Sequence, residues 1–177
     1  MYTTHYSNPG SLVGIDTGII GSAKKTLDMA AYALVDTDIV QAILAAAQHG
    51  VSIRLYLDRT ELEAEARGDP TLSRWAGRVL MGAPNVQIKV KESSVLMHLK
   101  SYLVDGATLR DGSANFSPEG EIQQDNSLTL TDDAAACGAF QAKFNAMWAR
   151  PDNLTVSQAV QPRSTGASRA FHPASRH

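Results

Sequence analysis

The stretch that decides the fold runs from residue 97 to residue 117 and reads MHLKSYLVDGATLRDGSANFS. Apolar and polar side chains alternate over residues 97–104, which is typical of a β-strand with one buried face. Successive side chains of a strand point to opposite faces, so His98 and Lys100 share a face and lie about 7 Å apart. An imidazole and an ammonium at that separation can hold one phosphate group between them.

Asp105 has the opposite parity and lies up to roughly 23 Å from His98 if the strand stays extended. With Gly106 it forms a dipeptide that favours a tight hairpin turn. We therefore interpret Asp105 as part of the scaffold that joins this strand to the next one.

A loop between Gly112 and Gly120 follows the second strand, and in it Ser113 and Asn115 can direct a hydroxyl and an amide at phosphate oxygens. The complete spacing is H-x-K-x4-D, then six residues, then G-S-x-N. This pattern resembles the catalytic signature of the phospholipase D superfamily. Residues 10–150 as a whole resemble its small, single-motif bacterial endonucleases.

The resemblance implies a phosphodiesterase that works in two steps. One His98 attacks to give a phosphohistidine, a second His98 protonates the leaving oxygen, and water then releases the product. Imidazole suits both tasks because its pKa lies near neutrality. Lys100, Ser113 and Asn115 would stabilise the negative charge, and Asp105 completes the motif. No cofactor or metal is implied, and the other histidines lack ligand spacing.

The resemblance also implies a partner for the catalytic histidine. In the family, an acidic residue just before an asparagine, at the start of the strand after the loop, orients that histidine. Here the pair is Asp125-Asn126, where close relatives have Glu followed by Asn. The side chain of Asp125 is shorter, and Glu119 and Glu121 are nearby alternatives. A turn-capping role is the structural alternative for Asp125.

The motif occurs once, and one His98 cannot be both nucleophile and acid for the same phosphodiester. Larger relatives solve this with two motifs in one chain. We therefore expect a homodimer that places two copies of His98 in one shared cleft, because a two-fold contact is self-complementary.

Composition bounds the class of protein. The 177 residues, 44% hydrophobic and 19% charged, are typical of one globular domain. The net charge of −2 gives no general basic footprint for nucleic acid, so only a local cluster could bind it. Lys89 and Lys91 share a face of one predicted strand, and Arg74, Arg78 and Arg110 are further candidates. Scattered solvated charge is the alternative for each.

The sequence also bears on localisation. No apolar run reaches membrane-spanning length, so no stable membrane insertion is expected. Residues 1–30 lack the basic start and apolar core of a signal peptide, which predicts a cytoplasmic protein or an exported mature form without its leader. The single cysteine, Cys137, excludes an internal disulfide and any multi-cysteine metal site.

Alternating strands and helices predict an α/β fold, a mixed β-sheet with helices on both faces. The strands are expected at residues 2–6, 26–34, 51–57, 86–91, 97–104 and 127–131. The helices are expected at residues 12–23, 38–49 with Asp38 as cap, 70–79 and 132–149. Residues 59–69 carry no clear pattern. One domain is expected over residues 1–150, with a disordered tail over residues 151–177.

Three function classes follow. The leading hypothesis is a metal-independent phosphodiesterase that cleaves DNA or RNA as a homodimer. The second is a phospholipase with the same chemistry, against which stands the lack of an interfacial helix with a basic polar face. The third is a catalytically silent nucleic-acid-binding module, and the intact His98, Lys100 and Asn115 argue against it.

Overall fold

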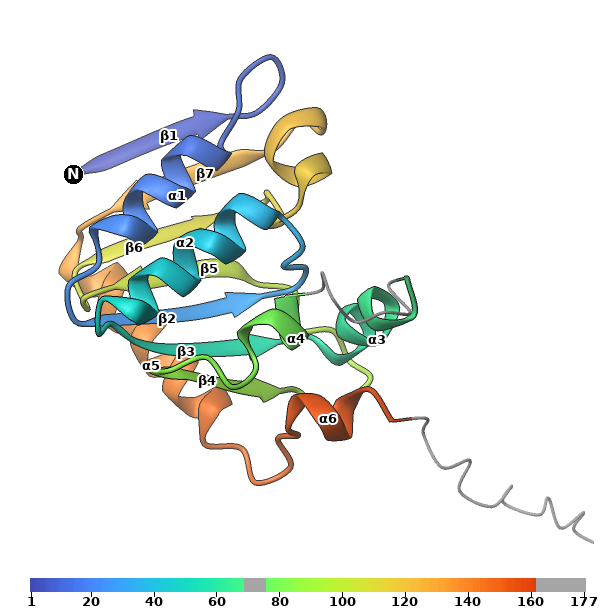
Figure 1. The fold of residues 1–177 in the computed structure, drawn as a ribbon. Helices are drawn as coiled ribbons and strands as arrows, with labels where there is room; N and C mark the ends of the chain where they lie inside the picture. Colours follow the sequence, from blue (N-terminus) through green and yellow to red (C-terminus); the bar gives the residue numbers. More distant parts are fainter. Residues whose placement is uncertain (69–75, 162–177) are drawn as a thin grey trace, which may run out of the picture.

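A computed structural model describes residues 1–68 and 76–161, and these form a seven-stranded sheet in the order β1-β7-β6-β5-β2-β3-β4 (Figure 1). The strands are β1 (Tyr2–Tyr6), β2 (Thr26–Ala31), β3 (Ser52–Leu57), β4 (Val86–Val90), β5 (Lys100–Val104), β6 (Thr108–Gly112) and β7 (Ser127–Thr131). β3 pairs in parallel with β2 and β4, and every other pairing is antiparallel. The predicted mixed sheet is confirmed.

Helices cover both faces of this sheet, as predicted (Figure 1). α1 (Val13–Ser22) and α2 (Thr37–Gln48) lie on one face, and α5 (Ala134–Trp148) lies on the other. Parallel neighbours need crossover connections, and α2 is the crossover from β2 to β3. The shorter helices are α3 (Arg59–Gly68), α4 (Ala76–Leu80) and α6 (Val156–Ala159).

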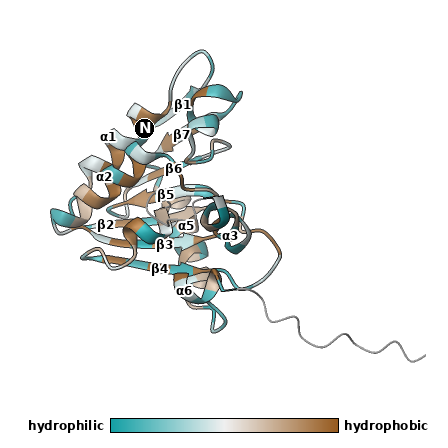
Figure 2. Cartoon of the chain, turned by 45° about the vertical axis from the view of Figure 1, so that its right-hand side comes forward, coloured by the Kyte–Doolittle hydropathy of each residue, from teal (hydrophilic) through white to brown (hydrophobic). Residues whose placement is uncertain are grey.

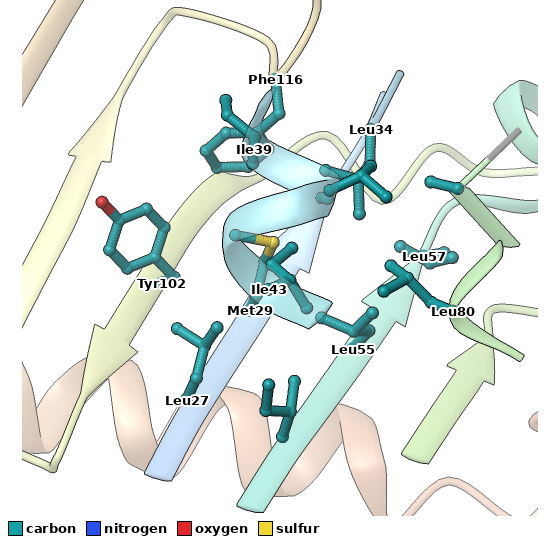
Figure 3. Packing of buried hydrophobic residues seen from close by; sticks show 14 of the residues in the cluster. Leu27, Met29, Leu34, Ile39, Ile43, Leu55, Leu57, Leu80, Tyr102 and Phe116 are labelled. Atoms are coloured by element: carbon teal, nitrogen blue, oxygen red, sulfur yellow. The ribbon is translucent and has the colours of Figure 1, made fainter. Parts of the chain in front are cut away.

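β2 shows how the sequence builds the core. Its side chains alternate, so Leu27 and Met29 point to the face where Ile39 and Ile43 of α2 cover them (Figure 3). Ala30 points to the other face and packs in the cluster of α5. All of these residues are fully buried. The near-continuous apolar run of β2 therefore belongs to a strand that is buried on both faces.

The start of α2 and the start of β5 were both predicted wrongly. In each case an aspartate carboxylate accepts the hydrogen bonds of backbone N–H groups near the boundary. α2 is capped by Asp36 and not by Asp38: the Asp36 carboxylate accepts the N–H groups of Asp38 and Ile39 at 3.0 and 3.1 Å. The strand predicted at residues 97–104 begins only at Lys100. The N–H of Met97 donates to the Asp58 carboxylate at 2.7 Å instead of to a neighbouring strand.

α3 forms in a stretch where the sequence showed no clear pattern, and Figure 2 shows it largely hydrophilic. Asp58 starts the helix by accepting the N–H groups of Thr60 and Glu61 at 2.9 and 3.2 Å. Arg59 and Glu63, one turn apart, form an ion pair at 2.8 Å. Leu62 is its buried apolar anchor. The helix predicted at residues 70–79 falls partly outside the described residues, and α4 covers its last part.

The tail was predicted to be disordered from residue 151, and this is wrong for residues 151–161. Leu154 exchanges two backbone hydrogen bonds with Val90 of β4, each 2.9 Å long. A capping box at Thr155 starts α6, and Val156 and Ala159 are buried in the main core. The folded unit therefore extends past residue 150. Residues 162–177 lie outside the described residues.

Candidate active site

The strand order brings most of the predicted site residues to one end of the sheet, which we call the His98 end. β2 and β3 finish there, β5 starts there, β6 finishes there and β7 starts there. His98 precedes β5, Ser113 and Asn115 follow β6, and Asp125 precedes β7. Ligands of open α/β sheets bind beyond the carboxyl ends of the parallel strands, so this end is the expected place for a site.

Tyr32 contacts both predicted catalytic groups at the His98 end. Its ring lies edge-on to the exposed imidazole of His98, with 4.6 Å between centroids. The ammonium of Lys100 lies 4.8 Å from the centroid of the same ring, in cation–π contact. Burial and then a hydrogen bond with Glu61 raise the pKa of Tyr32 to about 12, so its hydroxyl keeps its proton at neutral pH. Tyr32 thus holds the imidazole and the ammonium side by side.

Lys100 is only 5% exposed, and its ammonium donates to the carbonyl oxygen of His98 at 2.9 Å. Burial lowers the pKa of Lys100, and the negative charge of Glu61 opposes that shift. A cation held in a partly dry site attracts a phosphate more strongly than a solvated one. The arrangement leaves the imidazole accessible and holds the positive charge against the backbone of His98.

The loop after β6 is fixed by close backbone contacts. A side chain at Gly112 would come within 2.2 Å of the carbonyl oxygen of Ser127, which explains the glycine of the motif. The hydroxyl of Ser113 donates to Asn126 Oδ1 at 2.9 Å and accepts the N–H of Ser127 at 3.0 Å. In this conformation Ser113 orders the loop. Asn115 Oδ1 is buried without a hydrogen-bond partner.

Arg110 lies beneath the site and is fully buried. Its Nε and Nη2 donate to the Asp16 carboxylate at 3.1 and 2.9 Å, and Nη2 also reaches Glu121 at 3.3 Å. Its Nη1 donates to the carbonyl oxygens of Lys100 and Ala114 at 2.6 and 3.2 Å. The guanidinium therefore joins β5 to the loop after β6. The hypothesis that Arg110 contacts phosphate is wrong, because no substrate atom can reach it.

No hydrogen bond joins His98 to the acidic residues weighed as its partners in the described part of the chain. Asp125 is exposed and accepts a hydrogen bond from Asn8 at 3.3 Å, in a hollow whose lining does not include His98. Glu119 is exposed on the short π-helical turn 119–123. Glu121 is fully buried; burial and then the nearby Asp16 carboxylate raise its pKa to about 8.

Asp105 lies at the opposite end of β5 from His98, in the hairpin turn with a positive φ of 53°. Its carboxylate accepts the backbone N–H groups of Lys24, Lys25 and Thr26 at 2.7–2.9 Å. Partial burial opposes them, but these donors lower the pKa of Asp105. In this structure Asp105 ties the hairpin to the start of β2.

The two candidate lysines are both held by backbone carbonyl groups. Lys89 donates to the carbonyl oxygen of Trp148 at 2.8 Å, with its ammonium 4.9 Å from that indole ring. Lys91 donates to the carbonyl oxygens of Val95 and Leu96 and lines a cleft that also contains His98. Of the candidate arginines, Arg78 is exposed on α4 and Arg74 lies outside the described residues.

The geometry agrees with the family comparison. Residues 17–148 match the family described as "Cardiolipin synthase, PLD-like domain". The chain belongs to the phospholipase D-like family. This confirms the resemblance inferred from the motif.

Two solved structures and one curated protein are similar to this phospholipase D-like chain. Nuc from Salmonella typhimurium, a phospholipase D family member, has a TM-score of 0.71 at 22% identity, over 87% of this chain and 97% of that one. NucT from Helicobacter pylori has a TM-score of 0.67 at 17% identity, over 84% of this chain and 96% of that one. A mitochondrial cardiolipin hydrolase of Chlamydomonas reinhardtii is 25% identical over 129 residues, which are 73% of this chain and 54% of that protein. The chain thus spans about half the length of this curated relative.

No group of three or more His, Cys, Asp or Glu side chains in residues 1–68 and 76–161 is placed to hold a metal ion. No helix in the part of the chain that the structure describes has the length and apolar character to cross a membrane.

Sequence reasoning missed several residues around the phospholipase D-like motif. Tyr32 is one apolar residue in a longer run, and its role appears only once β2 is placed beside β5. Asp58 directly follows the strand predicted at residues 51–57, and its anchoring of the backbone before His98 was not predicted. The signal that could have found Asp58 is a carboxylate directly after a buried parallel strand, where ligands and loop anchors gather.

Proposed function

We propose that this protein is a phosphodiesterase whose catalytic nucleophile is His98, an endonuclease that cleaves DNA or RNA without a metal ion. One observation carries the proposal: an exposed imidazole and a buried ammonium both contact the ring of Tyr32 at the His98 end of the sheet. That pairing supplies a nucleophile beside a fixed positive charge, as displacement at a phosphodiester requires.

In the first step, a nitrogen of His98 attacks phosphorus. The P–N bond forms, the bond from phosphorus to the leaving oxygen breaks, and a second imidazolium gives its proton to that oxygen. In the second step, water attacks phosphorus, its proton passes to the second imidazole, and the P–N bond breaks. The enzyme thus returns to its starting state, and one water molecule has been consumed.

Lys100 and the loop after β6 supply the electrostatic stabilisation. The Lys100 ammonium is fixed by the Tyr32 ring and by the His98 carbonyl oxygen, so little reorganisation is needed when charge develops on the phosphate oxygens. Asn115 is the second donor that we assign. Ser113 holds the loop in place, because its hydroxyl proton already goes to Asn126.

The second imidazole comes from a second copy of the chain. His98 is the one histidine near Lys100 and Tyr32 among the described residues, and the motif occurs once in the sequence. A two-fold dimer with the His98 ends facing each other would place both imidazoles in one cleft.

Phospholipid is the second candidate substrate, and one observation favours it. The family description and the curated relative both refer to cardiolipin, a phosphodiester lipid. The same chemistry would apply to it, so the substrate class has to be settled by assay.

The test is a panel of labelled single- and double-stranded DNA, RNA and phospholipid vesicles, each with and without excess EDTA. We expect cleavage of a nucleic acid that persists in EDTA, because charge neutralisation is assigned to Lys100 and the imidazolium. Turnover of lipid alone would replace the nuclease proposal with the second candidate. Loss of turnover in EDTA, restored by a divalent ion, would contradict the metal-independent mechanism.

The shared site predicts a specific mixing curve. Wild-type and His98→Ala protomers are refolded together at varying ratios, and activity per total protein should fall as the square of the wild-type fraction. Only pairs of wild-type protomers would carry both imidazoles. A matched series with His49→Ala, an exposed histidine at the end of α2, should show no fall. A linear curve, with subunit mixing confirmed, would show that each chain holds a complete site.

A further inference from the structure

We propose that a cleft beside His98 is a subsite for the nucleotide unit next to the scissile phosphate, with Lys143 and Arg150 binding its phosphate. The inference rests on the proposed nuclease function and adds the residues that hold the neighbouring part of a polynucleotide. The cleft has a volume of about 320 Å³. Its lining residues are Lys91, Leu96, Met97, His98, Leu99, Lys143, Met147 and Arg150.

The position of the cleft defines its role. His98 lies in its wall, whereas Tyr32, Lys100 and the loop after β6 do not line it. A substrate whose phosphorus lies against His98 and Lys100 therefore has one side of its chain directed into this cleft. Lys143 and Met147, from the last part of α5, and Arg150, two residues after its end, also line the cleft.

The charges of the cleft suit a second phosphate. Its lining contains three cationic side chains and no acidic one among the described residues. Lys143 is exposed and has no hydrogen-bond or ion-pair partner in the described part of the chain, so its ammonium is free for a ligand. Arg150 is pre-oriented by the Tyr56 hydroxyl, 3.2 Å from its Nη1. Lys91 fixes the loop that forms the rim, through two of its carbonyl groups.

The remaining lining is apolar and suits a flat base or a sugar. Met97 and Met147 are buried and form the floor, and Leu96 lies at the rim with 46% exposure. A volume of about 320 Å³ lies at the lower end of the range of roughly 300–1,000 Å³ for small-ligand sites. That volume admits one nucleotide-sized unit and is smaller than a pair of acyl chains would fill. The combination of cations and a small apolar floor therefore favours a polynucleotide over a lipid.

The experiment compares two substrates that differ in the neighbouring phosphate. A single-stranded oligonucleotide carries it, and bis(p-nitrophenyl) phosphate does not. For Lys143→Gln, the ratio of kcat/KM on the oligonucleotide to kcat/KM on the small diester should fall about tenfold, mainly through KM. The slope of log kcat/KM against log salt should become shallower by roughly 0.7, because one phosphate contact with a single strand is lost.

The control is Lys24→Gln, which removes the same charge from an exposed lysine at the opposite end of the sheet. Its substrate ratio should stay unchanged. An equal fall in both variants would mean that Lys143 acts only through the overall charge, and this would overturn the subsite. An unchanged ratio in Lys143→Gln would overturn it as well.

Binding measurements separate this proposal from the nuclease proposal. Two proteins are compared, His98→Ala and the double variant His98→Ala/Lys143→Gln. A fluorescent oligonucleotide is titrated into each of them. In a second series, each protein is titrated with phosphatidylcholine vesicles that either contain or lack phosphatidylglycerol. Weaker oligonucleotide binding in the double variant is expected, even if the wild type fails to cleave. Weaker binding to the anionic vesicles alone would assign the cleft to a lipid head group and overturn the proposal.

Discussion

His98→Ala should lower kcat/KM on any phosphodiester substrate by at least ~10³-fold, with little change in the melting temperature. The imidazole is exposed, and apart from the edge of the Tyr32 ring it supports no other side chain in the described residues. Its removal therefore takes away the nucleophile and leaves the packing intact. The measurements are steady-state kinetics and thermal unfolding on the same preparation, with His49→Ala as the matched histidine control.

Lys100→Ala and Asp105→Ala complete this comparison. The first removes a group assigned to catalysis, and the second removes a group that stabilises the fold. Lys100→Ala should cost about 10²–10³-fold in kcat, the usual cost of removing one fixed donor to a developing charge. Asp105→Ala should instead lower the stability, since three backbone N–H groups lose their acceptor. An Asp105→Ala protein with the melting temperature of the wild type but no activity would show that Asp105 takes part in catalysis, and would contradict its structural role.

Much of the fold could be predicted because its signals are local. Four strands show in their sequence either alternating apolar and polar residues or a continuous apolar run, and these are β2, β3, β4 and β7. The motif indicated the hairpin of β5 and β6. The misplaced features depend on single carboxylates that capture backbone N–H groups, as Asp36 and Asp58 do. Such captures change where an element starts without changing its hydrophobic pattern.

The candidate site was only partly predictable, because its supports come from distant parts of the chain. The motif identified His98, Lys100 and Asn115 through local spacing. Asp16 and Arg110 are 94 residues apart, and the sequence indicated Arg110 only as a phosphate ligand or a solvated charge. No local periodicity shows that a helix charge and a strand charge neutralise each other in the interior. The tail was misread for a related reason, since Leu154 pairs with Val90, which lies far before it in the sequence.

Arg110→Met should be the most destabilising single change at the site, at a cost of about 3–5 kcal/mol of folding free energy. The variant leaves the Asp16 carboxylate without its cation in a fully buried position, and it also removes the guanidinium that contacts Glu121. The hydroxyl of Tyr102, which donates to Asp16 at 2.7 Å, cannot replace a positive charge. Chemical denaturation measures the loss.

The control is Arg54→Met, which breaks the other close arginine–aspartate pair, between Arg54 and Asp28 at 2.6 Å. The side chain of Arg54 is 28% exposed, and the Asp28 carboxylate, 8% exposed, keeps a hydrogen bond from the Gln141 amide at 2.7 Å. A smaller loss of about 1–3 kcal/mol is expected there, with activity retained in the folded fraction. Equal losses in the two variants would contradict the idea that the interior position of Arg110 sets the cost.

Arg110→Lys then tests whether this buried cation also positions the catalytic groups. Lysine keeps the charge, but one ammonium cannot reproduce the fork that reaches Asp16 and the carbonyl oxygens of Lys100 and Ala114 together. If Arg110 aligns β5 with the loop after β6, folded Arg110→Lys protein should show a kcat lowered by about tenfold or more with KM nearly unchanged, because small misplacements act on the transition state. A variant that loses stability but keeps the kcat of the wild type would confine Arg110 to the scaffold.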